Sequence, residues 1–533
     1  ANQHLFRTTD GGKHGALISP DLTRKTLTVP SNLDPVTAAD SAITTARRGV
    51  IYAIAPSRFN DHDIWTGTDD GLIWHTRDGG KHWQNVTPVA LSPWSKVGMI
   101  EAGHFNADTA YAAIDRHRLD DYKPYIYRTR DGGKHWTEIS NGIPDGSFVN
   151  VVREDPVRKG LLYAGTELGM YVSFDDGDHW QSLQQDLPVT SVRDITVHQD
   201  DLVIATHGRA FWVMDDITPL RQLDAQVKHA DAWLYQPAVA YRIKLASFTG
   251  TPLHRDEPTA ANPPVGAYLD YYLKTAAHAS VTLDILDSNG KVLRHYASTD
   301  KQHEPDLQKI NATPDWFHEP QVLAASAGMH RFVWDLREAA LDHGQSPGVW
   351  VVPGTYRARL TADGHAYTQT FTVREDPRVT ASQADLEKQY RLARQIETQR
   401  VQIATASKQA VGLLQQIDDL RARAPAGVAT QLAAFGTAVT AMTELHAVPV
   451  AYGIPGSAPA KVTSLHYLEN ALAALQDAVE SADTAPTADA VAGFQKQAAA
   501  SQAALAAWST FKSERLPPLN TALQQAGLPV LKL

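Results

Sequence analysis

The chain has 533 residues, of which 43% are hydrophobic, and a formal charge of −10 at neutral pH. This length accommodates about three domains of ordinary size, and an acidic chain without a basic stripe does not fit a nucleic-acid partner. The absence of cysteine excludes disulfides, cysteine nucleophiles and thiolate metal sites. The histidines are dispersed without metal-ligand spacing, so we expect no metal and no cofactor. No apolar run is long enough to span a bilayer.

A short motif, Ser/Thr-x-Asp-x-Gly-x-x-Trp, recurs in the N-terminal part of the chain at 8–15, 76–83, 129–136 and 173–180, with Gly15 in place of the first Trp. Its Asp and Ser/Thr side chains can bond backbone amides inside a turn, and its Gly permits positive φ. We expect the Trp to fold back onto its strand. Each copy therefore predicts a β-hairpin in which every residue type has a structural role.

The motif resembles the Asp-box, or bacterial neuraminidase repeat, of sialidases, some xyloglucanases and sortilin-type receptors. In those families it marks one hairpin per blade of a β-propeller, on the outer rim and away from the central funnel. The resemblance implies that these aspartates belong to the scaffold.

Strand-like segments surround each motif and complete a repeating blade. Before the fourth copy they are 148–153, 160–165 and 170–173, and 192–214 form a further blade without a motif. The total is about four blades, at the low end of the range for propellers. No inner strands precede the first motif. We infer that the chain is the C-terminal part of a longer polypeptide, or that another chain completes the ring.

The residue composition and the hydrophobic pattern change twice after the propeller. A Pro-rich stretch predicts a crossing linker, and short alternating strands between 266 and 373 then predict an Ig-like or fibronectin-like β-sandwich. The fold class is therefore mainly β, a partial Asp-box propeller followed by a sandwich and a helical bundle. The expected regions are the propeller 1–218, the linker 219–264, the sandwich 265–376 and the helical bundle 377–533.

The last region is helical. Thr380 and Gln383 have the spacing of a capping box, and Ile396, Ile403, Ala410 and Ile417 recur every seven residues. Further helices are expected at about 427–447, 464–482 and 487–515. We expect their apolar faces to pack within the chain, with homo-oligomer formation or partner docking through these helices as the alternative.

The order of regions, together with segments 153–166, 205–212 and 330–337, resembles a large family of bacterial exported proteins. Its members are commonly labelled glycosyl hydrolases with Asp-box repeats, or sortilin-type proteins. The resemblance implies export to the periplasm or the outside and additional N-terminal blades. It does not by itself establish an activity.

The candidate functional residues are polar groups at the ends of inner strands and in the loops of the funnel mouth, including an insertion at 115–124 that breaks the repeat. The candidate catalytic carboxyls are Asp69, Asp70 and Glu167. The candidate ligand-binding residues are Arg116, Arg118, Asp120, Asp121, Arg153, His207 and Arg209.

Two functions fit these residues. The first is a binding or scaffold protein that holds a peptide, glycan or protein partner in the funnel. The alternative is a glycosidase, in which Asp69 or Asp70 pairs with Glu167 as the two carboxyls of glycoside hydrolysis, and arginines hold an anionic sugar. The Arg-Ile-Pro motif that opens sialidase propellers is absent, and so is the Gly-x-Ser-x-Gly elbow of serine hydrolases. We favour the binding protein.

Overall fold

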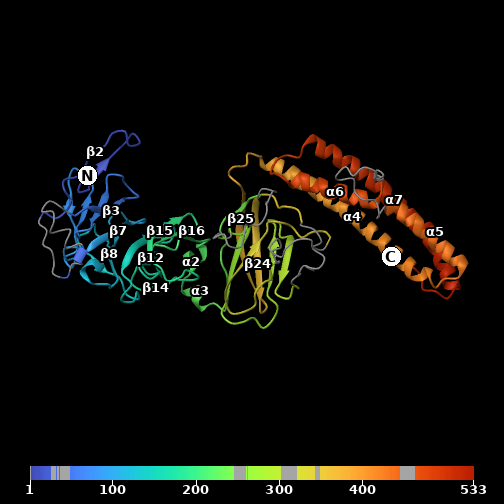
Figure 1. The fold of residues 1–533 in the computed structure, drawn as a ribbon, viewed down its shortest axis with the longest axis horizontal. Coiled ribbons are helices and arrows are strands. Elements are labelled where there is room, and N and C mark those ends of the chain that lie inside the picture. Colours follow the sequence, from blue (N-terminus) through green and yellow to red (C-terminus); the bar gives the residue numbers. More distant parts are fainter. Residues whose placement is uncertain are drawn as a thin grey trace. The chain divides into compact units, whose positions relative to one another are not determined.

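A computed structural model describes residues 2–25, 32, 35–36, 49–244, 260, 262–301, 321–342, 348–443 and 463–533. The chain divides into two compact units, Ala1–Leu223 and Asp224–Leu533 (Figure 1). The first unit is a partial β-propeller, and the second joins a β-sandwich to a C-terminal helical bundle. This mainly β architecture confirms the predicted fold class.

The propeller unit contains antiparallel sheets whose strands follow sequence order. A hairpin of β1 (Phe6–Arg7) and β2 (Ala16–Leu17) comes first. The blades are β3 (Ile51–Pro56), β4 (Ile64–Thr68), β5 (Ile73–Thr76) and β6 (Gln84–Asn85); β7 (Lys96–Ala102), β8 (Ala110–Asp115), β9 (Tyr125–Thr129) and β10 (Thr137–Glu138); β11 (Val149–Glu154), β12 (Leu162–Thr166), β13 (Met170–Ser173) and β14 (Gln181–Ser182); and β15 (Val192–His198), β16 (Asp201–Thr206) and β17 (Phe211–Met214). The first strands contact one another in the order β3, β7, β11, β15, so they form the inner edge of the propeller.

Neighbouring blades approach closely at a glycine in the second strands β4 and β12. Strands β4, β8 and β12 are buried along their whole length. A Cβ on Gly67 would lie 2.3 Å from Val97 Cγ1, and a Cβ on Gly165 would lie 2.5 Å from Val192 Cγ1. Both contacts join one blade to the inner strand of the next. These glycines therefore supply space between blades.

The four motif loops share one hydrogen-bond pattern, as their sequences predict. In the third loop, Thr129 Oγ1 accepts from the Gly133 amide at 2.9 Å, and Asp131 Oδ1 accepts from the His135 amide at 2.9 Å. The Thr129 hydroxyl also donates to Asp131 at 3.0 Å. The same bonds occur in the other copies. Each motif carboxylate thus holds its own loop.

The motif tryptophans connect successive blades, a contact that the sequence did not reveal. The indole nitrogens of Trp83, Trp136 and Trp180 donate to backbone carbonyls of the preceding repeat at 2.9, 2.7 and 2.6 Å. The acceptors are Ile18, Val86 and Ile139. The second glycine of each following loop packs on the same residue: a Cβ on Gly80 would lie 2.1 Å from Ile18 O. A side chain there would push neighbouring repeats apart.

The sandwich consists of two sheets around the core residue Trp334. One sheet has β18 (Ala232–Leu234), β20 (Ala267–Leu273) and β23 (Gly328–Trp334), and the other has β19 (Ala240–Arg242), β25 (His365–Glu375), β24 (Gly354–Ala362), β21 (Thr282–Leu286) and β22 (Val292–Ala297). Strands β18 and β19 lie inside the predicted linker 219–264, as do α3 (Ala225–His229) and most of α2 (Thr218–Gln222). Three-residue strands are too short to show the alternation by which a strand is recognised. Most of the later linker lies outside the described residues.

The helical bundle contains α4 (Gln383–Arg421), α5 (Ala426–Thr443), α6 (Leu465–Glu480) and α7 (Ala488–Gln525). The predicted heptad residues Ile396, Ile403, Ala410 and Ile417 are all buried on α4. The N-cap is Ser382, which accepts from the Asp385 amide, and not Thr380. Residues 444–447 of the predicted second helix lie outside the described residues.

Helix α7 continues past the predicted end at Arg515 and through Pro517 and Pro518. An interior proline costs about 3 kcal/mol. Leu516, Leu519 and Leu523 are buried in the bundle core on either side of the prolines, and this packing offsets the cost. Among the described residues, no helix has both the length and the apolarity that a membrane crossing needs.

A buried polar cluster attaches the bundle to the sandwich. Arg242 on β19 is 1% exposed and donates to Asp483 Oδ1, which follows α6, at 2.5 Å. It also donates to Gln389 Oε1 on α4 at 2.9 Å and to the Val351 carbonyl at 2.8 Å. These bonds fix the start of the bundle against one sheet.

We predict that Asp131→Asn lowers the stability of the propeller at neutral pH and has little effect near pH 2. The His135 amide and imidazole lower the pKa of Asp131 from 3.8 to about 2. A carboxyl with a lowered folded pKa stabilises the protein above its unfolded pKa, and this contribution disappears as the pH falls through the folded value. Urea unfolding midpoints of wild type and variant should therefore converge between pH 4 and pH 2.

The matched control is Asp186→Asn, since Asp186 is exposed and has no hydrogen bond to the described residues. Its unfolding midpoint should follow that of wild type at every pH. A gap between wild type and Asp131→Asn that stays constant from pH 7 to pH 2 would contradict the assigned role.

Candidate functional site

The predicted site residues lie at opposite ends of the inner strands. We call the end where β3, β7, β11 and β15 begin the upper end, and the end where they finish the lower end. Because β11 pairs antiparallel with β12, with Val149 opposite Thr166, the loop carrying Glu167 lies at the upper end. Arg153, opposite Tyr163, lies at the lower end. All the other candidates are in loops that follow a second strand, so the structure brings them to the upper end.

Three candidates occupy equivalent backbone positions at the upper end. The amides of Asp69, Glu167 and His207 donate to the residue that precedes the inner strand of the same blade, at 3.0, 3.0 and 2.8 Å. In the second blade this position belongs to Asp115, which the sequence showed only as the first residue of the insertion. Asp115 is buried and its carboxylate accepts from His117 Nδ1 at 2.6 Å. These hydrogen bonds to His117 keep the pKa of Asp115 low against the opposing effect of burial, which is the largest single influence.

Asp70 holds the upper-end loop together and does not face the mouth. It is fully buried. Its carboxylate accepts from the Arg24 amide at 2.9 Å and from the Thr68 hydroxyl at 2.5 Å. The Arg24 side chain donates in turn to the Asp70 carbonyl at 2.8 Å. A carboxylate with these partners is not available to a ligand.

Asp69 and Glu167 are each engaged with an arginine. Asp69 accepts from the Val50 amide at 2.7 Å and lies 3.8 Å from Arg118. Burial raises the pKa of Asp69. Glu167 accepts from the Ser191 hydroxyl at 2.6 Å and pairs with Arg193 at 3.3 Å. Among the described residues these two carboxyls share no hydrogen-bond partner, so the contacts do not bring them together as a pair.

The insertion after β8 is folded by its own residues. A short 3-10 turn at His117–Leu119 ends at Asp120, whose φ of 55° is left-handed. Arg116 pairs with Asp121 at 3.3 Å, and Asp121 accepts from the Tyr125 hydroxyl at 2.9 Å. The insertion therefore presents a defined shape to the mouth.

His207 and Arg209 remain available at the upper end. Both are exposed, and their side chains make no hydrogen bond or ion pair to the described part of the chain. The loop is held through its backbone: the Arg209 amide donates to Thr206 Oγ1 at 3.2 Å, and its carbonyl accepts from Trp212 Nε1 at 2.8 Å. The His207 imidazole and the Arg209 guanidinium can therefore bind a ligand without breaking a contact within the protein.

At the lower end, Arg153 connects three inner strands. Its guanidinium donates from β11 to Glu101 on β7 at 2.9 Å, and to Asp194 on β15 at 2.8 Å. Its Nε donates to the Ile195 carbonyl at 2.8 Å. All three nitrogens of the Arg153 guanidinium donate to groups of the protein. We therefore assign Arg153 a structural role.

A polar cavity of about 280 Å³ lies beside this arginine. Glu154 accepts from the His104 amide at 2.7 Å, and Glu101 lies 2.9 Å from His104 Nε2. Burial raises the pKa of Glu154. The sequence analysis did not select either glutamate as a candidate, because each stands near the end of a strand without a motif that marks it. The lining residues are Arg58, Glu101, His104, Arg153, Glu154, Pro156, Ile195, Thr196 and Val197.

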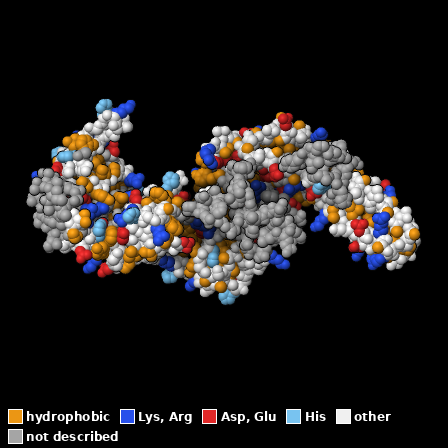
Figure 2. All heavy atoms as spheres, viewed as in Figure 1, with side chains coloured by type: hydrophobic (Ala, Val, Ile, Leu, Met, Phe, Trp, Pro, Cys, Tyr) orange, Lys and Arg blue, Asp and Glu red, His pale blue; other side chains and the backbone are white. Residues whose placement is uncertain are grey.

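On the face shown in Figure 2, Lys and Arg side chains are mixed with Asp and Glu side chains and do not gather in a stripe. The described residues contain no group of three or more metal-ligating side chains.

No protein-family model matches the chain. One curated relative, the oligoxyloglucan-reducing end-specific xyloglucanase of Emericella nidulans, is 27% identical over 107 residues, which are 20% of this chain and 13% of that protein. The chain thus matches only a small part of that relative's length.

Solved structures with similar parts include YCF48 bound to D1 peptide, with 19% identity over 31% of this chain and 52% of that one, and a TM-score of 0.26. The GH74 xyloglucanase from Xanthomonas campestris has 13% identity over 31% of this chain and 29% of that one, with a TM-score of 0.25. An ancestral GH74 enzyme has 16% identity over 46% of this chain and 32% of that one, with a TM-score of 0.26.

We predict that Arg153→Ala destabilises the propeller by about 3 kcal/mol, because it leaves buried Glu101 without its charged partner and separates three inner strands. Urea unfolding followed by tryptophan fluorescence measures the loss. Arg130→Ala is the control, since Arg130 forms an exposed ion pair with Asp176 and should cost at most about 1 kcal/mol. Equal losses in the two variants would show that Arg153 does not connect the strands.

Proposed function

We propose that the propeller unit is a binding module that holds a peptide or protein segment at its upper end, with a glycan as the other ligand class that the mouth could accept. The proposal rests on a difference between the acidic and the basic candidates at the upper end. The acidic groups Asp69, Asp70 and Glu167 are engaged internally, while His207 and Arg209 are exposed and uncommitted.

Exposed apolar side chains accompany these free groups. Tyr52 on β3 is 55% exposed, Leu168 beside Glu167 is 45% exposed, and Tyr122 in the insertion is 50% exposed. Aromatic and apolar anchors beside arginines are the usual composition of a recognition surface. An extended segment with apolar and acidic side chains would complement both kinds of group.

The same contacts disfavour catalysis at the upper end. Glycoside hydrolysis needs one carboxyl as acid and a second as nucleophile or base, both facing the substrate. Asp70 is buried and fully bonded, and Asp69 and Glu167 lie with different arginines. This arrangement supports binding at the upper end.

We also propose that further blades complete the ring, from the rest of a longer polypeptide or from another chain. Phe211 and Val213 on β17 are 77% and 52% exposed, and Ile54 on β3 is 54% exposed. Strand β17 has no fourth strand beside it among the described residues, unlike the third strand of the other blades. Exposed apolar strands of this kind are normally covered. The family resemblance of the sequence supports an exported protein.

The test is selection of a displayed library of twelve-residue peptides on the immobilised full chain, followed by Kd measurement for the selected peptide. We expect Arg209→Ala to weaken binding by about tenfold, which corresponds to loss of one charge-assisted hydrogen bond of about 1.4 kcal/mol. Arg58→Ala is the control, because Arg58 is exposed and uncommitted at the lower end.

Equal Kd values for wild type and Arg209→Ala would remove Arg209 from the site. A selection that enriches no peptide would contradict a peptide-binding mouth.

The alternative function, a glycoside hydrolase, is favoured by one observation at the lower end. Glu154 has a pKa raised by burial, while Glu101 accepts from the Arg153 guanidinium at 2.9 Å and lies 2.9 Å from His104 Nε2. Two carboxyls in unlike environments are the arrangement that supplies an acid and a base. The short sequence match to a protein named as a xyloglucanase supports this alternative.

If the lower-end cavity is catalytic, the full chain should release reducing ends from xyloglucan oligosaccharides, with a rate that falls as the pH rises through the pKa of Glu154. Glu154→Gln should abolish this release, whereas the exposed Glu138→Gln should not change it. No release by the wild-type chain would rule this function out for these residues.

A further inference from the structure

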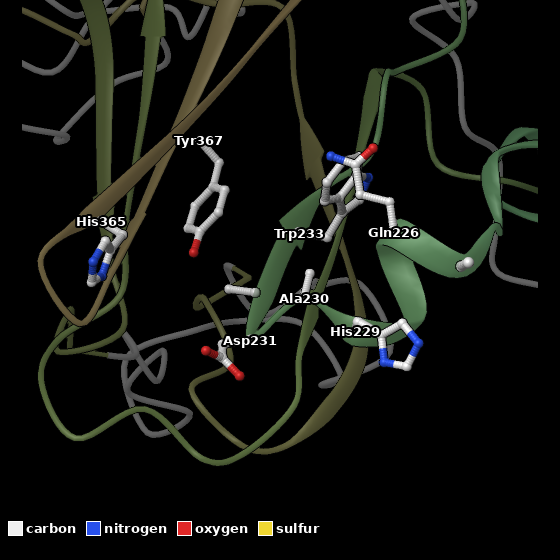
Figure 3. Close-up of a pocket in the computed structure, with 9 residues that line it drawn as sticks. Gln226, His229, Ala230, Asp231, Trp233, His365 and Tyr367 are labelled. Carbon is white, nitrogen blue, oxygen red and sulfur yellow. The ribbon is translucent and has the colours of Figure 1, made fainter.

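The sandwich unit contains a second cavity, separate from the propeller. Its volume is about 590 Å³, and it lies among α3, β18 and the beginning of β25 (Figure 3). The lining residues are Ala225, Gln226, His229, Ala230, Asp231, Ala232, Trp233, His365 and Tyr367.

The cavity exists because two sheet edges diverge. Strand β25 pairs with β19 only over Val373–Glu375, so its earlier half has strand β24 on one side only among the described strands. Strand β18, at the edge of the other sheet, approaches that half through two amide bridges, Gln369 to the Leu234 carbonyl at 3.0 Å and Gln236 to the Thr370 carbonyl. Before these bridges, α3 borders the cavity on the side of β18 (Figure 3).

Two aromatic side chains face this space from different sheets. Figure 3 shows Tyr367 and His365 on one side of the cavity, and Trp233, Gln226 and His229 on the other. Trp233 belongs to β18 and Tyr367 to β25. A cavity with aromatic walls from opposite sides can hold a flat, partly apolar molecule between them.

Trp233 also carries an unsatisfied donor. Its Nε1 is buried and has no hydrogen-bond partner within the described ranges. A buried donor without a partner costs about 1–3 kcal/mol, and buried indole nitrogens normally find an acceptor. Because this atom has almost no solvent-accessible surface, a ligand in the cavity contacts the Trp233 ring and not its N–H.

The polar lining disfavours an anionic ligand. Gln226, His229 and His365 are donors and acceptors without fixed charge, and the carboxylate of Asp231 lies 3.2 Å from Lys274 Nζ. No arginine or lysine is among the lining residues to recognise a phosphate or carboxylate. The lining instead offers amide, imidazole and carboxylate groups around aromatic faces.

From these observations we propose that this cavity binds a neutral oligosaccharide. A pyranose ring presents an apolar C–H face to Tyr367 and Trp233, and its hydroxyls bond to Gln226 and Asp231. The sandwich would then attach the chain to a polysaccharide independently of the propeller.

The experiment titrates the full chain with cellohexaose, xylohexaose and mannohexaose, followed by tryptophan fluorescence and isothermal calorimetry. We expect at least one to bind with a 1:1 stoichiometry. Trp233→Phe replaces the indole by a smaller ring, reduces the aromatic face that meets the sugar, and should weaken binding about fivefold. Tyr367→Ala should weaken it at least as much.

Tyr241→Ala is the matched control, an aromatic residue of the same unit that is 37% exposed and does not line the cavity. If Trp233→Phe lowers the melting temperature, Gln226→Ala replaces it as the test of the cavity. Gln226 lies on the short helix α3, so its loss should affect the sandwich core less. Absence of binding for all three sugars, or binding that Trp233→Phe, Tyr367→Ala and Gln226→Ala leave unchanged, would overturn the proposal. Neither result would bear on peptide binding by the propeller.

Discussion

The propeller depends on the hydrogen bond from the motif tryptophan of one repeat to a backbone carbonyl of the repeat before it. The bonds from Trp83, Trp136 and Trp180 measure 2.6–2.9 Å and recur with the same geometry. The second glycine of the motif makes the bond feasible, since a Cβ there would lie only 2.1–2.6 Å from an atom of the acceptor residue. The outer rim is therefore hydrogen-bonded from blade to blade. On the inner strands, Arg153 connects β11 to β7 and β15.

This double attachment leaves the loops of the upper end free for recognition. The backbone of each loop is bonded to the residue before its own inner strand, so side chains at that position can vary between blades without loss of structure. Asp69, Asp115, Glu167 and His207 show that variation. Three of them have been taken into internal contacts, and only His207 remains uncommitted, next to Arg209.

Features that depend on residues close together in the sequence could be predicted from it. Contacts between residues far apart in the sequence could not. The motif bonds of Asp131 lie within a few residues, and the buried face of α4 repeats every seven, so both were readable. The partner of Trp136 is 50 residues away, and strand β18 is recognisable only once β20 is beside it. Most of the candidate residues lie in loops at one end of the inner strands, a position that follows from the order of strands, whereas the engagement of Asp70 with Arg24, 46 residues away, is a tertiary contact.

The bonds between repeats also have a direction along the chain. In each pair the acceptor carbonyl comes earlier in the sequence, as with Ile18 before Trp83, and the donor comes later. During synthesis from the N-terminus, the acceptor of each of these three bonds is therefore made before its donor. The first motif has Gly15 at the donor position, so it accepts from the second repeat and donates no such bond. These contacts can therefore form in the order of translation, each when the later of its two repeats has been made.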